Sequence, residues 1–161
     1  MDLHILHVED DKVDALLLKR ALEQTVFCGA DGHKCDIHIR HVHSLGSALT
    51  AAGEEKFDAV LLDLSLTDVC GLDNVRALRA QQPQTPIIIL SGNADMRLAE
   101  EALRIGACDY VTKTDMGEPV LALAITRACT KKLRALPTPL RQKSGSKPLV
   151  FTHTQKHCAL L

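Results

Sequence analysis

The chain has 161 residues, of which 46% are hydrophobic and 24% are charged, and its formal net charge at pH 7 is −1. This length and composition are typical of one globular domain with a substantial core, and the near-neutral charge gives no indication of a nucleic-acid or membrane-surface partner. The six cysteines show no disulfide spacing, no apolar run reaches the roughly 18 residues of a membrane span, and the N-terminus lacks the basic region of a signal peptide. We therefore expect a cytoplasmic protein that binds neither a membrane nor nucleic acid directly.

Strand-like and helix-like segments alternate through the first 134 residues. Short apolar runs rich in Val, Ile and Leu predict buried parallel strands, and the amphipathic stretches between them predict helices. In chain order the expected elements are strand Leu3–Val8, helix Lys12–Thr25, strand Asp36–Val42, helix Leu45–Glu54, strand Phe57–Leu62, helix Leu72–Ala80, strand Ile87–Leu90, helix Asp95–Ile105, strand Asp109–Thr112 and helix Glu118–Leu133. This alternation predicts an α/β fold: a flavodoxin-like, doubly wound, five-stranded parallel sheet of order 2-1-3-4-5 with five helices.

Local signals refine three of these helices. The apolar residues expected along one face of the first helix are Val13, Leu16, Leu17 and Leu22. Ser44 is the predicted N-cap of the second helix, and Gly106 is predicted to end the fourth in a left-handed conformation.

The composition changes after Leu136. Prolines and a Ser-Gly-Ser stretch crowd residues 135–161, which carry four basic residues and no acidic ones. We interpret residues 1–134 as one domain and residues 135–161 as a flexible tail or linker without a second domain.

Polar residues follow four of the predicted strands at the points where those strands end. Glu9 and Asp10 follow the first strand, Asp63 the third, Ser91 the fourth and Lys113 the fifth. In an open α/β sheet the ligand crevice lies at the carboxyl ends of the strands. These residues therefore predict one binding site, with charges suited to Mg²⁺ and a phosphoryl group.

Residues 3–134 resemble the receiver domain of response regulators in two-component signalling, a chemotaxis-regulator-like fold. The resemblance rests on an ordered set of motifs: Glu9-Asp10, Asp63, Gly71, Leu90-Ser91-Gly92, Gly106-Ala107 and Tyr110-Val111-Thr112-Lys113. It implies a phosphoprotein of a phosphorelay, which is not an enzyme beyond self-catalysed phosphotransfer and autodephosphorylation.

The resemblance also implies a role for each site residue. Glu9, Asp10, Asp63 and the backbone carbonyl of Ser65 would bind Mg²⁺, whose preferred ligands are oxygens. Asp63 would be the phosphoacceptor, taking its phosphoryl group from a sensor histidine kinase or a histidine phosphotransfer protein.

Three further side chains would complete the switch. Lys113 and the Ser91 hydroxyl would contact the phosphoryl oxygens, and Tyr110 would change rotamer in response. The surface of the fourth helix, fifth strand and fifth helix would then present the signal to a protein effector, because a modification of about −1.5 to −2 charge biases a two-state element. A homodimer through the fourth and fifth helices stays open, as does the choice between a stand-alone regulator and part of a longer one.

Two positions depart from the family pattern. Thr67 stands four residues after Asp63, and Thr114 directly after Lys113, where the family commonly has prolines. The family has a cis peptide before the second proline, whereas a cis bond before a non-proline costs about 3–4 kcal/mol. We therefore expect phosphorylation of Asp63, with a rate and lifetime that these positions affect.

Two other functions fit parts of the sequence. Asp63-Leu64-Ser65-Leu66-Thr67 resembles the opening motif of haloacid-dehalogenase-type phosphatases, but Ser65 stands where that family has its general acid/base, a role commonly worth 10²–10⁴-fold in rate. A phosphorylation-independent interaction module is the other alternative, and the complete acidic site argues against it.

Two further patterns, a histidine cluster and a C-terminal cysteine motif, are weaker indications of function. The histidines from His33 to His43 lack zinc-finger spacing, so a half-buried strand is the favoured interpretation. The C-terminal Cys158-Ala159-Leu160-Leu161 fits a prenylation motif, but four-residue matches arise easily by chance.

Overall fold

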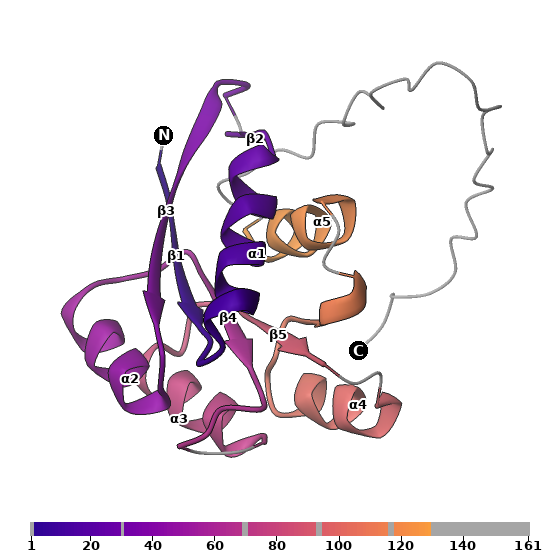
Figure 1. Cartoon of the computed structure of the whole chain (residues 1–161). Coiled ribbons are helices and arrows are strands. Elements are labelled where there is room, and N and C mark those ends of the chain that lie inside the picture. The colour runs from indigo at the N-terminus through magenta and orange to yellow at the C-terminus, as the bar shows by residue number, and fades with distance from the viewer. Residues whose placement is uncertain (1, 30, 69–70, 93–94, 116–117, 130–161) are drawn as a thin grey trace, which may run out of the picture.

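The computed structural model describes residues 2–29, 31–68, 71–92, 95–115 and 118–129. These residues form a central sheet of order β2-β3-β1-β4-β5-β6 (Figure 1). Its strands are β1 (Asp2–Val8), β2 (Phe27–Cys28), β3 (Lys34–Val42), β4 (Ala59–Asp63), β5 (Ile87–Ser91) and β6 (Asp109–Thr112). All neighbours pair in parallel except β2, which pairs antiparallel with the start of β3.

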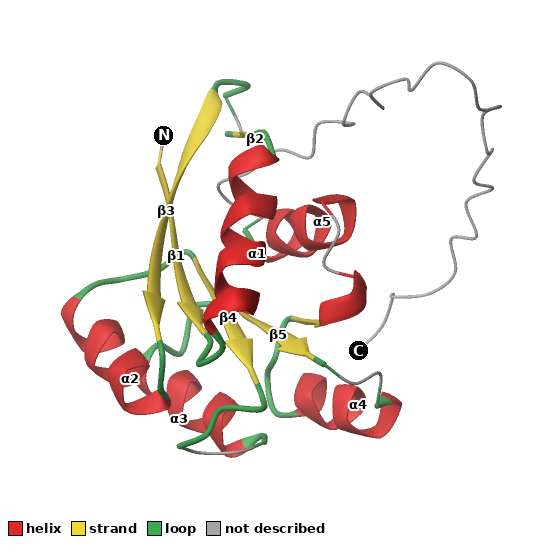
Figure 2. Ribbon diagram, in the orientation of Figure 1, coloured by secondary structure: helices red, strands yellow, loops and turns green. Residues whose placement is uncertain are grey.

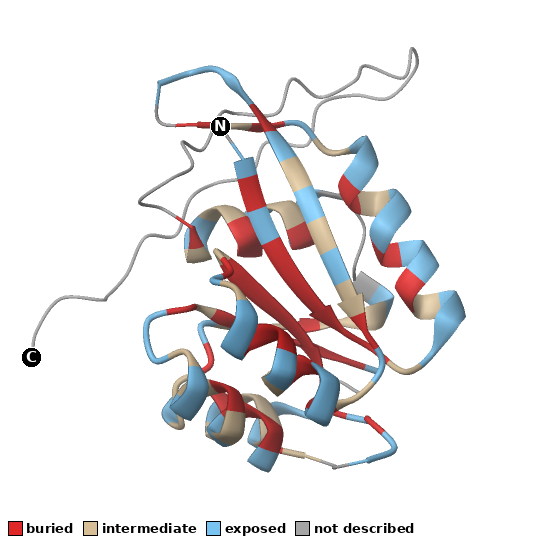
Figure 3. Ribbon diagram, turned by 90° about the vertical axis from the view of Figure 1, so that its left-hand side faces the viewer, coloured by how far each residue is buried: buried red, intermediate tan, exposed pale blue. Residues whose placement is uncertain are grey.

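Helices cover both faces of the sheet (Figure 2). In the described part of the chain these are α1 (Lys12–Gln24), α2 (Leu45–Glu54), α3 (Asp73–Gln81), α4 (Met96–Arg104) and α5 (Glu118–Ala128). One core cluster joins α1 and α5 to the sheet, and the other joins α2, α3 and α4 to the opposite face. Figure 3 shows the central strands buried between these two layers.

The predicted fold is confirmed, with one addition. Without the short β2, the strands keep the expected order 2-1-3-4-5. The sequence pattern did not predict β2, because two residues are too few for a periodic signal. The expected tail, residues 135–161, and the fifth helix beyond residue 129 lie outside the described residues.

Two of the three local predictions are confirmed, and one is wrong. The Ser44 side chain caps α2, and Gly106 has a φ of +110° after α4. In α1, however, the buried residues are Ala15, Leu18 and Leu22, whereas three of the four residues expected along one apolar face are exposed. Those three are Val13 (65% exposed), Leu16 (49%) and Leu17 (53%). The helix carries two apolar stripes, and only packing against the sheet selects which one is buried.

Candidate functional site

The carboxyl ends of the parallel strands bring the predicted carboxylates together. Glu9 and Asp10 directly follow β1, and Asp63 is the last residue of its neighbour β4. Carboxylate oxygens of these three residues lie within 4.8 Å of one another. The side chains of Glu9 and Asp63 are buried, and Asp10 is half-buried. This grouping is the one that the strand ends predicted.

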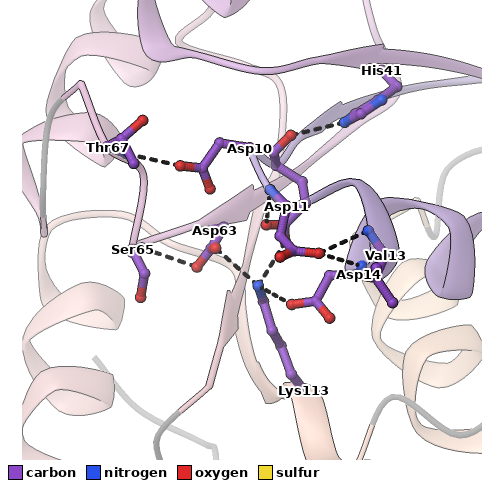
Figure 4. Close-up of polar contacts among 10 residues, drawn as sticks. Asp10, Asp11, Val13, Asp14, His41, Asp63, Ser65, Thr67 and Lys113 are labelled. Atoms are coloured by element: carbon purple, nitrogen blue, oxygen red, sulfur yellow. Dashed lines mark hydrogen bonds and ion pairs between the residues drawn. The ribbon is translucent and has the colours of Figure 1, made fainter.

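Lys113 contacts three carboxylates at once (Figure 4). Its Nζ lies 2.7 Å from Glu9 Oε2, 2.9 Å from Asp63 Oδ2 and 2.7 Å from Asp14 Oδ2. The lysine begins the short 3₁₀ helix Lys113–Asp115 that follows β6. No cis peptide bond occurs among the described residues, so the bond between Lys113 and Thr114 is trans, and the lysine still reaches Asp63.

Backbone amides orient the acidic side chains. The amide of Ser65 donates to Asp63 Oδ1 (2.9 Å), and that of Asp11 donates to Glu9 Oε1 (3.1 Å). The amide of Thr67 donates to Asp10 Oδ2 (3.1 Å). A proline at position 67 could not make this last bond because it has no N–H. The departure from the family pattern therefore adds a contact between the loop after β4 and the acidic pair.

The site carries more negative than positive charge. Burial, together with the charge of Asp63, raises the pKa of Glu9 to about 7, although the hydrogen bond from Lys113 opposes the shift. Burial also acts to lower the pKa of Lys113, but the hydrogen bonds to Asp14, Glu9 and Asp63 outweigh it and the pKa lies above its usual value. Both pKa values are raised, so both Glu9 and Lys113 hold their protons more tightly than usual, since one ammonium faces several carboxylates. Such a site favours a further cation.

The remaining predicted residues lie at or near the same edge of the sheet. Ser91 is buried at the end of β5, directly after Leu90, the register partner of Asp63. Ser65 is exposed in the loop after β4. Tyr110 lies in the middle of β6 and packs against the core on the α2, α3 and α4 side. The proposed roles of these three side chains stay predictions.

The histidines form a separate arrangement on β1 and β3. His41 Nε2 lies 2.8 Å from the carbonyl oxygen of Glu9, and its ring contacts those of His7 and His43. His4 stacks on His38. The group with metal-ligand spacing in the described part of the chain consists of carboxylates and contains no histidine.

Asp14 is the site residue that the sequence pattern did not indicate. It lies in the first turn of α1, four residues after Asp10, and a spacing of four places two helical side chains on one side. The four-residue spacing between Asp10 and Asp14 could have indicated that they lie together. However, Asp10 precedes the helix, and the spacing rule holds only for two residues within a helix.

None of the helices in the described ranges is long and apolar enough to cross a membrane.

The sequence matches known regulators over most of its length. The chain is 30% identical over 155 residues to the photosynthetic apparatus regulatory protein RegA of Rhodobacter capsulatus. The aligned region covers 96% of this chain and 76% of RegA. It is 38% identical over 119 residues to the uncharacterized transcriptional regulatory protein YkoG of Bacillus subtilis, covering 74% of this chain and 48% of YkoG. The match therefore spans less than half the length of YkoG.

Solved structures share the fold. A response regulator protein from Burkholderia pseudomallei, with a phosphorylated aspartic acid, calcium ion and citrate, is 29% identical with a TM-score of 0.64, covering 81% of this chain and 70% of that one. The BeF3-activated DrrB receiver domain is 25% identical with a TM-score of 0.66, covering 81% of this chain and 99% of that one. The profile of the response regulator receiver domain matches residues 5–125. This chain belongs to the response regulator receiver domain family of two-component signalling.

Proposed function

We propose that the chain is a phospho-accepting switch in which Asp63 takes a phosphoryl group from the phosphohistidine of a sensor histidine kinase or a histidine phosphotransfer protein. One observation carries the proposal: the buried Asp63 carboxylate lies 2.9 Å from the Lys113 ammonium and within 4.8 Å of the Glu9 and Asp10 carboxylates. Phosphoryl transfer depends mostly on positioning and charge stabilisation, and these residues can supply both.

The reaction forms one bond and breaks another. A carboxylate oxygen of Asp63 attacks phosphorus, the P–N bond of the donor breaks, and the imidazole nitrogen leaves with the electron pair and takes up a proton. The Ser65 amide holds Asp63 Oδ1, while Lys113 lies against Oδ2 and compensates the charge that develops on the phosphoryl oxygens. Attack by water on the phosphorus of the resulting acyl phosphate breaks its bond to the Asp63 oxygen, which regenerates the carboxylate and releases inorganic phosphate.

The donor set fits Mg²⁺. Glu9, Asp10, Asp63 and the backbone carbonyl of Ser65 would hold the ion, since Mg²⁺ prefers oxygen ligands and accepts one or two carboxylates with water and phosphate oxygens. The raised pKa of Glu9 reflects a buried carboxyl with too little positive charge around it. When bound, the ion neutralises charge on the carboxylates and the incoming phosphoryl group.

The signal would leave through α4, β6 and α5. Ser91 would hydrogen-bond a phosphoryl oxygen and draw in the loop after β5, and Tyr110 would change rotamer. Met96 and Leu103 on α4 are exposed apolar residues, 73% and 47%, which suits a surface that binds a protein effector or a second receiver.

The exposed stripe of α1 is our candidate docking surface for the phosphodonor. Val13, Leu16 and Leu17 lie on the helix that also carries Asp14, a contact of Lys113, so a protein seated there would lie beside Asp63. On α5, which packs beside α1, Val120 and Leu123 are also exposed.

The double variant Leu16→Ser, Leu17→Ser is expected to slow phosphoryl transfer from a phosphohistidine protein to Asp63 by roughly tenfold or more. The reason is that a few apolar residues dominate most interfaces. Phosphorylation by acetyl phosphate should change less than about twofold, because that donor needs no docking surface. Leu103→Ser on α4 is the matched control and should slow neither reaction. Equal slowing of both reactions by the α1 variant would exclude α1 as the docking surface.

The proposed function is tested with acetyl phosphate and Mg²⁺. Intact-mass measurement should show the gain of one phosphoryl group in the wild type and none in Asp63→Asn. No Asp63-dependent gain would overturn the proposal. Multiple turnover on simple phosphate esters would favour a phosphatase instead, and unchanged partner binding by Asp63→Asn would favour a phosphorylation-independent module.

A further inference from the structure

Asp14 is a third carboxylate on Lys113, in addition to Glu9 and Asp63. Its Oδ2 lies 2.7 Å from Nζ, as close as Glu9 Oε2 and closer than Asp63 Oδ2. In Figure 4 the lysine amino group lies between the side chains of Asp14 and Asp63. The Asp14 side chain is 34% exposed, whereas those of Glu9 and Asp63 are almost fully buried.

The other two partners of Lys113, Glu9 and Asp63, are also candidate metal ligands. Glu9 Oε1 and Asp63 Oδ1 already accept backbone amides, so the lysine occupies the second oxygen of each carboxylate. A cation held by Glu9 and Asp63 would share these two carboxylates with the lysine. Asp14 is outside the metal-ligand group, so its contact with the lysine does not depend on those oxygens.

The position of Asp14 is set by α1 rather than by the site. Asp11 caps the helix by accepting the amides of Val13 (2.7 Å) and Asp14 (3.0 Å). Asp14 is the acidic residue of the first turn, where the helix dipole favours a carboxylate. The side chain therefore starts from a helix backbone that is capped independently of the contacts made by Lys113.

We infer that Asp14 is a positioning residue for Lys113: it keeps the ammonium beside Asp63 when Glu9 and Asp63 bind a cation and when Asp63 carries a phosphoryl group. The inference rests on the proposed function. Without Asp14, the carboxylates of Glu9 and Asp63 are the partners left to the lysine among the described residues, so it competes with the cation and loses its fixed position once the cation is bound.

Asp14→Asn tests this inference, with Asp11→Asn as the matched control. Both changes remove one negative charge at the start of α1, and asparagine at position 11 still caps the helix. Phosphorylation of Asp63 by acetyl phosphate at saturating Mg²⁺ should slow about threefold to tenfold in Asp14→Asn, because charged hydrogen bonds are strong and this one is partly exposed. Asp11→Asn should stay near the wild-type rate.

Three further measurements separate positioning from a general effect of charge. In a Lys113→Ala background, Asp14→Asn should cause no additional slowing, because no lysine remains to be held. Asp14→Glu, which keeps the carboxylate, should recover at least half of the wild-type rate. Calorimetric titration with Mg²⁺ alone should show weaker binding in Asp14→Asn than in Asp11→Asn, and this difference should disappear in the Lys113→Ala background.

Equal effects of Asp14→Asn with and without Lys113, or equal effects of the two asparagine variants, would overturn the inference. The Mg²⁺ titration needs no phosphorylation. If the wild type takes no phosphoryl group, the proposed function fails, while the coupling between Asp14 and Lys113 is still decided by the titration.

Discussion

Lys113→Ala is expected to slow phosphorylation of Asp63 by about 10²–10³-fold, the usual cost of removing one preorganised donor from a site of developing charge. The lysine Nζ lies 2.9 Å from Asp63 Oδ2, and it also contacts Glu9 and Asp14. The measurement is the initial rate of mass gain with acetyl phosphate at saturating Mg²⁺.

The same change should destabilise the folded chain. Removing one partner of a buried ion pair leaves an uncompensated charge, with a cost of about 3 kcal/mol at neutral pH without metal. Because protonation of Glu9 relieves part of that cost, the loss should be smaller at pH 5. Urea unfolding at both pH values measures it.

Lys113→Arg is the control that separates charge from geometry. Arginine keeps a positive charge but is larger and planar, so stability should be largely retained while the phosphorylation rate still falls. A rate for Lys113→Ala within about threefold of the wild type would contradict the electrostatic role, because removing a single preorganised donor costs far more than that.

Glu9→Gln is expected to stabilise the metal-free protein at pH 8 by up to about 3 kcal/mol, since each pH unit of pKa shift corresponds to about 1.4 kcal/mol. The pKa of Glu9 is raised from 4.5 to about 7 in the folded state, mainly by burial. Between these values the unfolded chain loses the proton while the folded chain keeps it, so stability falls as pH rises. Above about pH 7 the full penalty is present, and below 4.5 it is absent.

Urea unfolding from pH 4.5 to pH 8 checks this prediction. The wild type should lose stability across this range relative to Glu9→Gln, and saturating Mg²⁺ should restore the wild type more than the variant. Glu23→Gln removes an exposed carboxylate of α1 and should shift stability by less than about 0.5 kcal/mol. Parallel curves for the wild type and Glu9→Gln would show that Glu9 has no raised pKa.

The acidic cluster and the lysine were predictable because strand ends are a simple geometric signal. Glu9, Asp63 and Lys113 each follow an apolar run of parallel-strand type, and adjacent parallel strands end at the same edge of a sheet. Their proximity therefore needed only the order of the strands. The contact of the Thr67 amide with Asp10 was not predictable, because it depends on the path of a loop with no periodic pattern.

The sequence alone predicted the α/β class from hydrophobic periodicity, and the candidate site residues from their places at the ends of the apolar runs. The strand order was predicted from the doubly wound fold of which this alternation is typical. Tertiary structure decided which stripe of α1 is buried, leaving Leu16 and Leu17 outside, and it brought Asp14 onto Lys113. It also set the raised pKa of Glu9, which arises mainly from burial. The physical reason is common to all three: helix docking, long-range ion pairs and desolvation depend on neighbours that are distant in the chain, and local patterns do not encode them.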